Sequence, residues 1–99
     1  MAELIISKAA VEHNAAIIRQ HIGPAQAIGV IKANGYGLGT TTLAQLLTGC
    51  GVQMLAVSEL EDGLTLRRCG FEQQLLLLTP LYDARQLQQA ISHNIIITL

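Results

Sequence analysis

Short apolar runs alternate along this chain with longer segments whose apolar residues recur every three or four positions. A run of four to eight apolar residues between turn residues is typical of a buried strand, whereas the longer spacing is typical of a helix that buries one face. The apolar runs cover residues 2–6, 27–31, 52–57, 74–78 and 95–99. The sequence therefore predicts an α/β fold in which five strands alternate with four helices.

The segments between these runs carry the signals of helix ends. The first helix follows Ser7, a favourable N-cap, and is stopped by Gly23 and Pro24. The third begins with Ser58 and Glu61, which are spaced as a capping box, and ends at Gly70 after two arginines in its last turn. Apolar stripes are expected on the first helix, at Val11, Ala15, Ile18 and Ile22, and on the second, at Leu43, Leu46, Leu47 and Cys50. In the fourth, within residues 83–93, Leu87, Ala90 and Ile91 are expected to face inward.

The strands from residue 27 onward are continuously apolar instead of alternating, which predicts a parallel sheet covered by helices. Two closures fit this pattern: an open doubly wound sheet or a (β/α)₈ barrel of the triosephosphate isomerase type. Such a barrel takes about 250 residues, so residues 1–99 would form only its first part. The last run reaches the C-terminus without a cap or turn, and we therefore expect a truncated chain and a single partial domain.

Composition excludes several classes of function. The net charge is −1 and no basic block occurs, so nucleic acid is not an expected partner. The longest strongly apolar stretch, residues 75–78, is far short of the roughly 20 residues of a membrane span. The N-terminus lacks the pattern of a signal peptide. Cys50 and Cys69 form no Cys-x-x-Cys pair. We expect a cytoplasmic protein with two reduced thiols.

The loop after the second apolar run carries the strongest chemical signal. Lys32 directly follows the strand, at the end of a parallel strand where active sites of such folds form. An apolar wall around this amine would disfavour its charged form and lower its pKa, and a neutral amine is the form that attacks a carbonyl. Three glycines at alternate positions, 35, 37 and 39, would let a ligand approach the backbone. The simpler interpretation, a solvated lysine before an ordinary turn, stays open.

Two other glycine-rich motifs do not fit this loop. A dinucleotide fingerprint reads G-x-G-x-x-G, but the sixth position is Thr40 when counted from Gly35 and Thr42 when counted from Gly37. A P-loop needs a lysine after its last glycine, where Thr40 stands.

Residues 30–39, V-I-K-A-N-G-Y-G-L-G, closely resemble the cofactor motif of alanine racemases, which usually reads V-V-K-A-N-A-Y-G-H-G. The resemblance extends along the chain through residues 2–4, 10–14, 55–57, 61, 66–67, 70 and 75–78. Other amino-acid racemases, D-serine dehydratases and D-threonine aldolases share a lysine at this place but match the loop less well. Two positions depart from the motif: Gly35 stands for the usual Ala, and Leu38 for the usual His. Both departures would weaken the preorganisation of the loop.

The resemblance implies a (β/α)₈ barrel followed by a β-rich domain, a homodimer, and pyridoxal 5'-phosphate as cofactor. It implies that Lys32 holds the cofactor in a Schiff base and is the catalytic base on one face of the substrate. It also implies that Tyr36 contacts the cofactor phosphate and that Leu78, at the end of the third barrel strand, packs near the cofactor. The second acid/base of the family is a tyrosine of the partner's C-terminal domain, and Tyr82 does not match it.

Three functional hypotheses follow from the resemblance. The first is part of an alanine racemase, a pyridoxal-phosphate-dependent isomerase that interconverts L-alanine and D-alanine and supplies D-alanine for peptidoglycan. The second is a truncated remnant without catalytic activity. The third is a module that binds the cofactor through Lys32 without turnover. The sequence leaves the preferred side chain of the substrate open, because most of the pocket lies outside these residues.

Other polar residues have structural explanations. His13, His21 and His93 lie far apart on helices, which favours surface positions over a metal site. The acidic group Glu59, Glu61 and Asp62 would stabilise the positive end of its helix. In the lysine loop, Asn34 is suited to hydrogen-bond the loop backbone or to adopt a positive φ.

Overall fold

The computed structural model of the chain describes residues 8–23, 25–37 and 39–99. The strand expected at residues 2–6 lies outside these ranges. The observed elements are α1 (Lys8–Ile22), β1 (Ile28–Ile31), α2 (Ala33–Tyr36), α3 (Thr40–Gly49), β2 (Met54–Val57), α4 (Leu60–Arg68), β3 (Gln74–Leu77), α5 (Ala84–Ser92) and β4 (Ile95–Ile96). The alternation of strands and helices predicted from the apolar runs is therefore confirmed over the described residues.

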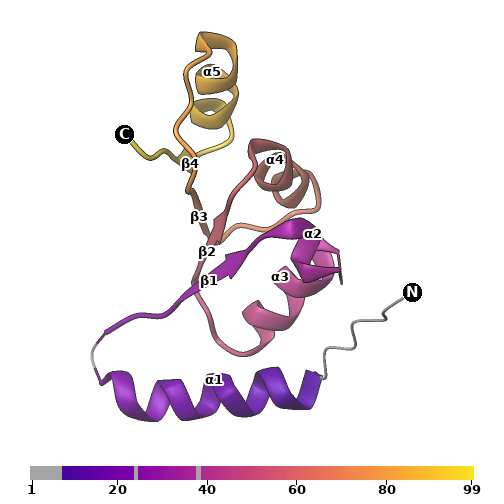
Figure 1. Ribbon diagram of the computed structural model, residues 1–99, viewed down its shortest axis with the longest axis vertical. Helices are drawn as coiled ribbons and strands as arrows, with labels where there is room; N and C mark the ends of the chain where they lie inside the picture. Colours follow the sequence, from indigo (N-terminus) through magenta and orange to yellow (C-terminus); the bar gives the residue numbers. More distant parts are fainter. Residues whose placement is uncertain (1–7, 24, 38) are drawn as a thin grey trace.

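The four strands form one parallel sheet in the order β1-β2-β3-β4. Each strand is thus paired with its neighbours in sequence, and each crossover contains a helix. Right-handed crossovers of this kind place all the helices on the same face of the sheet, and Figure 1 shows α3, α4 and α5 on one side of the strands. A doubly wound sheet reverses its strand order and carries helices on both faces. The observed order is that of a (β/α)₈ barrel, of which these strands form an arc.

The side chains of the sheet divide into a helix-facing set and an open set. The register aligns Gly29 with Leu55, and Ile31 with Val57, on the helix-facing side. There the side chains of β2 and β3 are fully buried and form the core with the helices. The alternate positions face away from the helices, and two of them, Val30 and Ile96, are 38% and 42% exposed. The sheet therefore has one covered face and one apolar face that no described element covers.

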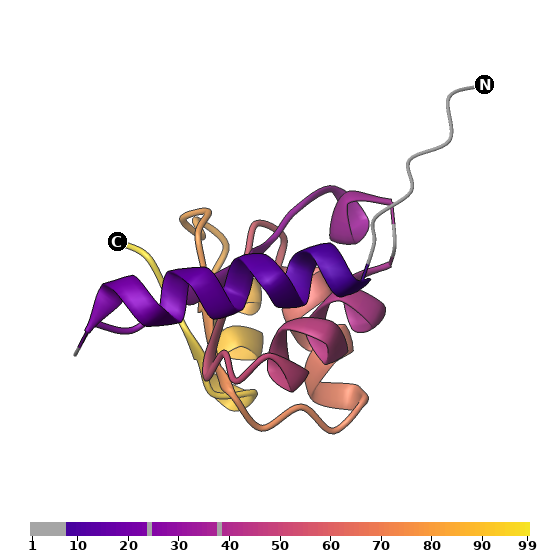
Figure 2. The ribbon, with the colours of Figure 1, turned by 90° about the horizontal axis from the view of Figure 1, so that it is seen from below.

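Helix α1 forms where the sequence predicts it, and its apolar stripe is not buried. None of its residues is buried, and Ile18 is 49% exposed. The helix packs against α3 alongside the edge of the sheet instead of lying over it (Figures 1 and 2). Its apolar stripe consequently borders a pocket and is not part of the core.

Two details of the later helices also differ from the predictions. Helix α4 begins at Leu60 with Glu59 as its N-cap and without a side-chain cap, so the capping box of Ser58 and Glu61 is absent. In α5, Ala90 is buried as predicted, whereas Ile91 is 64% exposed. Successive helical positions are about 100° apart, and the face that carries Ala90 toward the sheet turns Ile91 outward.

One arginine joins three segments at the amino ends of β3 and β4. The guanidinium of Arg67 donates to the carbonyl oxygens of Phe71 and Gln73, both at 2.8 Å, just before β3. It also donates to those of His93, at 2.8 Å, and Asn94, at 3.0 Å, just before β4. Helix α4 thereby holds the entry segments of two neighbouring strands.

Candidate active site

Lys32 lies at the carboxyl end of β1, immediately after the buried Ile31. Its backbone is extended, with φ −129° and ψ 164°, so the strand alternation continues and Lys32 takes the face of Val30. The lysine therefore belongs to the open apolar face of the sheet, at its carboxyl edge. The expectation that an apolar wall surrounds Lys32 is not met, because its side chain is exposed. Apolar side chains of the sheet lie on one side of Lys32, and no described element covers its other side.

Leu78 reaches the same edge. Ile31, Val57 and Leu77 occupy one row of the sheet, and the N–H of Leu78 donates to the carbonyl oxygen of Val57 at 2.8 Å. The next row therefore brings together Lys32, Ser58 and Leu78. The structure thus places two of the three expected site residues, Lys32 and Leu78, at the carboxyl edge of the sheet, with β2 between them. This edge is called the rim below.

The third expected residue, Tyr36, is placed by its backbone only. It closes the turn α2, and its side chain lies outside the described part of the structure. Leu38, which stands for the usual His, lies outside it as well.

The turn that follows Lys32 is left-handed. Ala33, Asn34 and Gly35 have φ values of 49°, 54° and 69°. A left-handed conformation costs most residues with a Cβ about 1–2 kcal/mol, so Ala33 carries strain, whereas Asn34 is a residue type that adopts this conformation readily. The N–H of Gly37 donates to the oxygen of Ala33 at 3.3 Å, and that of Gly39 to the oxygen of Asn34 at 2.8 Å. The positive φ and the loop hydrogen bond expected for Asn34 are both confirmed.

Asn34 also closes the start of α3. Its Oδ1 accepts a hydrogen bond from the backbone N–H of Thr40 at 3.3 Å. Gly39 stands at the N-cap position of α3 and has no side chain to satisfy the free N–H groups of the first turn. The amide oxygen of Asn34 takes this capping role from outside the helix.

Thr40 links the loop to a second helix. Its side chain is 5% exposed, and its Oγ1 lies 3.1 Å from Oδ1 of Asp62 and 3.4 Å from Oδ1 of Asn34. Asp62 lies in the first turn of α4, where the sequence predicts stabilisation of the helix dipole. Sequence reasoning missed its contact with Thr40, because positions 22 residues apart carry no local spacing signal.

The three histidines lie on the surface, as the sequence predicts. His13, His21 and His93 are exposed, and Nδ1 of His21 and of His93 each lie 2.8 Å from a carbonyl oxygen of their own helix. Cys50 is buried, Cys69 is exposed, and both are free thiols. No group of ligating side chains suited to a metal ion occurs within residues 8–23, 25–37 and 39–99. In the same ranges, every helix is too short or too polar to cross a bilayer.

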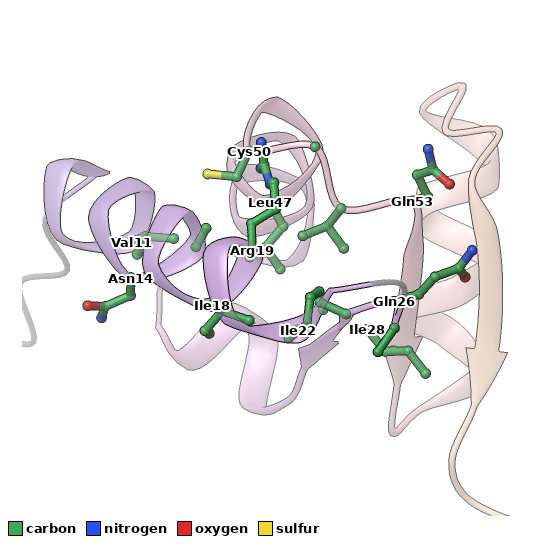
Figure 3. A pocket seen from close by; sticks show the side chains of 16 residues that line it. Val11, Asn14, Ile18, Arg19, Ile22, Gln26, Ile28, Leu47, Cys50 and Gln53 are labelled. Carbon is green, nitrogen blue, oxygen red and sulfur yellow. The ribbon is translucent and has the colours of Figure 1, made fainter.

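A pocket of about 450 Å³ lies elsewhere, between α1, the start of β1 and the end of α3. Figure 3 shows apolar side chains of α1, including Ile18 and Ile22, opposite Ile28 and Leu47. The pocket is at the amino ends of the strands, whereas Lys32 is at the carboxyl ends. Catalysis in (β/α)₈ barrels takes place at the carboxyl ends, so the rim of Lys32 is the candidate active site and this pocket is not.

Comparison with known proteins agrees with this arrangement. The family model described as the alanine racemase N-terminal domain matches residues 6–99. An alanine racemase of Mycobacterium tuberculosis is 40% identical over 76 residues, which are 77% of this chain and 20% of the relative. An alanine racemase of Acidithiobacillus ferrooxidans is 39% identical over 85 residues, which are 86% of this chain and 23% of the relative.

Solved structures show the same similarity. The crystal structure of alanine racemase from Corynebacterium glutamicum has a TM-score of 0.74 and 32% identity, and the match covers 91% of this chain and 26% of that one. Alanine racemase from Bacillus anthracis, solved with bound L-Ala-P, has a TM-score of 0.86 and 26% identity, with 99% and 27% covered. This chain thus spans about a fifth to a quarter of the length of these relatives. The resemblance found in the lysine loop is confirmed across the chain, which belongs to the alanine racemase N-terminal domain family.

Proposed function

We propose that this chain is the lysine-bearing first part of the barrel of an alanine racemase, a pyridoxal-phosphate-dependent isomerase that interconverts L-alanine and D-alanine. The observation that carries the proposal is the position of Lys32, on the open face of the sheet at its carboxyl rim. The full enzyme would act in the cytoplasm as a homodimer and would supply D-alanine for peptidoglycan. The family match over residues 6–99 supports this proposal.

The residues at the rim suit pyridoxal 5'-phosphate. Lys32 offers an exposed primary amine, which can bond covalently to an aldehyde carbon. Leu78 and the open face below the rim offer apolar surface for an aromatic ring. Tyr36, two positions after Asn34, would donate its phenol to the phosphate. When bound, the cofactor supplies an electron sink for the charge left at the substrate's α-carbon.

The role of Lys32 in turnover is proton transfer at Nζ. A neutral Nζ can accept the α-proton from the face of the substrate that it approaches and later return it. Inversion needs a second acid/base on the opposite face. None of the described residues of the rim faces Lys32 from across the open side of the sheet. That second group would come from another part of the full enzyme, and the dimer partner is where the family carries it.

A cofactor-binding module without turnover is the second candidate function. The observation that favours it is that Lys32 is the one candidate base at the rim among the described residues. Covalent capture of the cofactor needs the lysine and its loop, whereas racemisation needs two bases.

Cofactor capture tests the proposal. The purified protein is mixed with pyridoxal phosphate and reduced with borohydride, and the adduct is located by peptide mass spectrometry. Lys8 is an internal control, since its side chain is 78% exposed and lies on a different element, α1. We expect labelling concentrated on Lys32 and lost in Lys32→Ala. Equal labelling of Lys8 and Lys32, or none, would contradict the proposal. Exchange of the α-proton of alanine in deuterated water then separates turnover from capture.

A further inference from the structure

We propose that Asp62 is a positioning residue for Lys32, acting through Thr40 and Asn34 on the left-handed turn that follows the lysine. The inference rests on the proposed function, because it assigns Asp62 to the site of Lys32. Asp62 belongs to α4, and its carboxylate accepts a hydrogen bond from Thr40, the first residue of α3. Its effect on the lysine would therefore be indirect.

The first step is the choice of acceptor for the Thr40 hydroxyl. This group has one proton to donate and two candidate acceptors, Oδ1 of Asp62 at 3.1 Å and Oδ1 of Asn34 at 3.4 Å. The carboxylate is nearer, and a hydrogen bond to a charged acceptor is stronger than one to a neutral amide. The hydroxyl therefore donates to Asp62, and this bond fixes the rotamer of Thr40 in a buried position.

The second step is the effect on Asn34. With the hydroxyl committed to Asp62, Oδ1 of Asn34 accepts from the backbone N–H of Thr40. That bond ties the Asn34 side chain to the start of α3, while its backbone oxygen accepts from Gly39. The side chain and the backbone oxygen of Asn34 are thus both bonded while the residue holds its left-handed conformation. Without Asp62, the Thr40 hydroxyl is free to turn toward Asn34 and compete for the same oxygen.

The third step connects this conformation to the lysine. Ala33 is the only residue between Lys32 and Asn34, and it has a positive φ as well. The direction in which the chain leaves β1 is therefore set by the same left-handed turn. A turn that relaxes changes the direction and mobility of Lys32 relative to the rim. Asp62 would thus reduce the number of orientations from which Nζ meets the cofactor.

The test compares three variants of the purified protein. Asp62→Ala removes the acceptor, Asp62→Asn keeps an oxygen acceptor without the charge, and Glu61→Ala is the matched control. Glu61 lies in the same turn of α4, is 76% exposed and pairs with Arg68 instead of Thr40. The readout is the rate of borohydride-trapped labelling at Lys32 divided by the rate at Lys8, with the thermal unfolding midpoint measured alongside.

We expect Asp62→Ala to lower this ratio about tenfold, which corresponds to the loss of one hydrogen bond to a charged group. Asp62→Asn should lower the ratio less than Asp62→Ala does, because its oxygen is still the nearer acceptor but carries no charge, and Glu61→Ala should keep all of the ratio. A fall in the unfolding midpoint of Asp62→Ala with an unchanged ratio would mean a merely structural role and would overturn the proposal. An equal fall in Asp62→Ala and Glu61→Ala would also overturn it, since charge alone would then explain the effect.

A second measurement separates this inference from the proposed function. Amide hydrogen exchange at Gly39 and Thr40 reports the two hydrogen bonds to Asn34 without any cofactor. We expect faster exchange at both amides in Asp62→Ala and not in Glu61→Ala. If the unmodified protein shows no preference for Lys32, the proposed function fails, and the exchange rates alone decide whether Asp62 orders the turn. Unchanged exchange in Asp62→Ala would refute the positioning role.

Discussion

The turn around residue 35 leaves little room for a side chain. Gly35 is buried with φ +69°, and an added Cβ would lie 3.2 Å from the backbone nitrogen of Thr40. Alanine racemases usually carry Ala at this place. The glycine here removes both the steric cost of the left-handed conformation and the contact with α3. Glycine is thus suited to this turn, and hydrogen bonds hold the backbone around it.

We therefore expect Gly35→Ala to destabilise the protein by about 1–2 kcal/mol. Gly49→Ala is the matched control, because Gly49 lies in α3 with ordinary φ and no atom within 4 Å of its added Cβ. This control should stabilise the protein by about 0.5–1 kcal/mol, the usual gain of Ala over Gly in a helix. Urea unfolding measures both. A neutral or stabilising Gly35→Ala would show that the turn does not need glycine.

Arg67 is the residue whose loss should affect stability most clearly. Its guanidinium donates to four backbone carbonyls in the segments before β3 and β4. Burial lowers the pKa of Arg67 from its usual value, and the carboxylate of Glu72 opposes the shift. A guanidinium stays protonated through the accessible pH range. The bonds should therefore persist wherever the protein is folded.

Replacing Arg67 by Lys keeps the charge but cannot reproduce the planar fork of donors. We expect Arg67→Lys to lower the free energy of unfolding by about 2 kcal/mol, the scale of lost hydrogen bonds to a charged group. Arg68→Lys is the control, because Arg68 is exposed and makes a surface ion pair with Glu61. Its effect should stay below about 0.5 kcal/mol. Similar losses in both variants would contradict the bridging role of Arg67.

At the scale of the elements, α4 and α5 begin in different ways. The carboxylate of Asp83 accepts from the N–H groups of Arg85 at 2.7 Å and Gln86 at 3.4 Å, and so caps α5. Ser58 lies outside α4, and its side chain caps nothing there. The backbone oxygen of Ser58 accepts from the hydroxyl of Thr79 at 2.6 Å. This bond does not depend on the Ser58 side chain.

Asp83→Ala should therefore cost about 1 kcal/mol, as the loss of a helix cap usually does. Asp83→Asn should recover most of that loss, since Asn caps about as well as Asp. Ser58→Ala should change stability by less than about 0.5 kcal/mol. Thermal unfolding compares the three. If Ser58→Ala lowered the stability as much as Asp83→Ala, the result would support the capping box that the sequence predicts.

The sequence predicts the elements well where one signal acts alone and less well where two compete. The four strands of the sheet are predicted within a few residues, because a short apolar run between turn residues is typical of a strand in a buried parallel sheet. The start of α4 is predicted wrongly. Ser58 and Glu61 have the spacing of a capping box, but Ser58 still continues the extended segment after β2 and lies outside the helix. The inward position predicted for Ile91 is wrong because periodicity marks an apolar face but not what covers it, and the exposure of the stripe residue Ile18 has the same cause.

At the scale of the whole molecule, the parts of the site that depend on local sequence are predicted, and those that depend on packing are not. Lys32 and the turn at Asn34 could be predicted from a contiguous motif. The link from Thr40 to Asp62 could not, because it depends on how α3 packs beside α4. The exposure of Lys32 likewise depends on the open face of the sheet, which no local pattern describes.

That open face and the outer edges of β1 and β4, which pair with no other strand within the described ranges, should drive self-association of the purified 99-residue protein. Exposed apolar side chains on a sheet face and unpaired strand edges favour pairing with another chain. We expect its mass from size-exclusion chromatography with light scattering to rise with concentration. Ile96→Lys, on the open face, should reduce the rise, whereas Ile91→Lys, on the outer side of α5, should not. A monodisperse monomer at all concentrations would contradict this prediction.

The strand order has a consequence for how the chain acquires its fold. Each strand pairs with the strand that precedes it in sequence, so each pairing closes only the loop that contains one helix. Contacts between segments near in sequence form quickly, and synthesis delivers the N-terminal segments first. The sheet can therefore grow by one strand at a time as the nascent chain leaves the ribosome, with each new strand docking on an edge that is already formed.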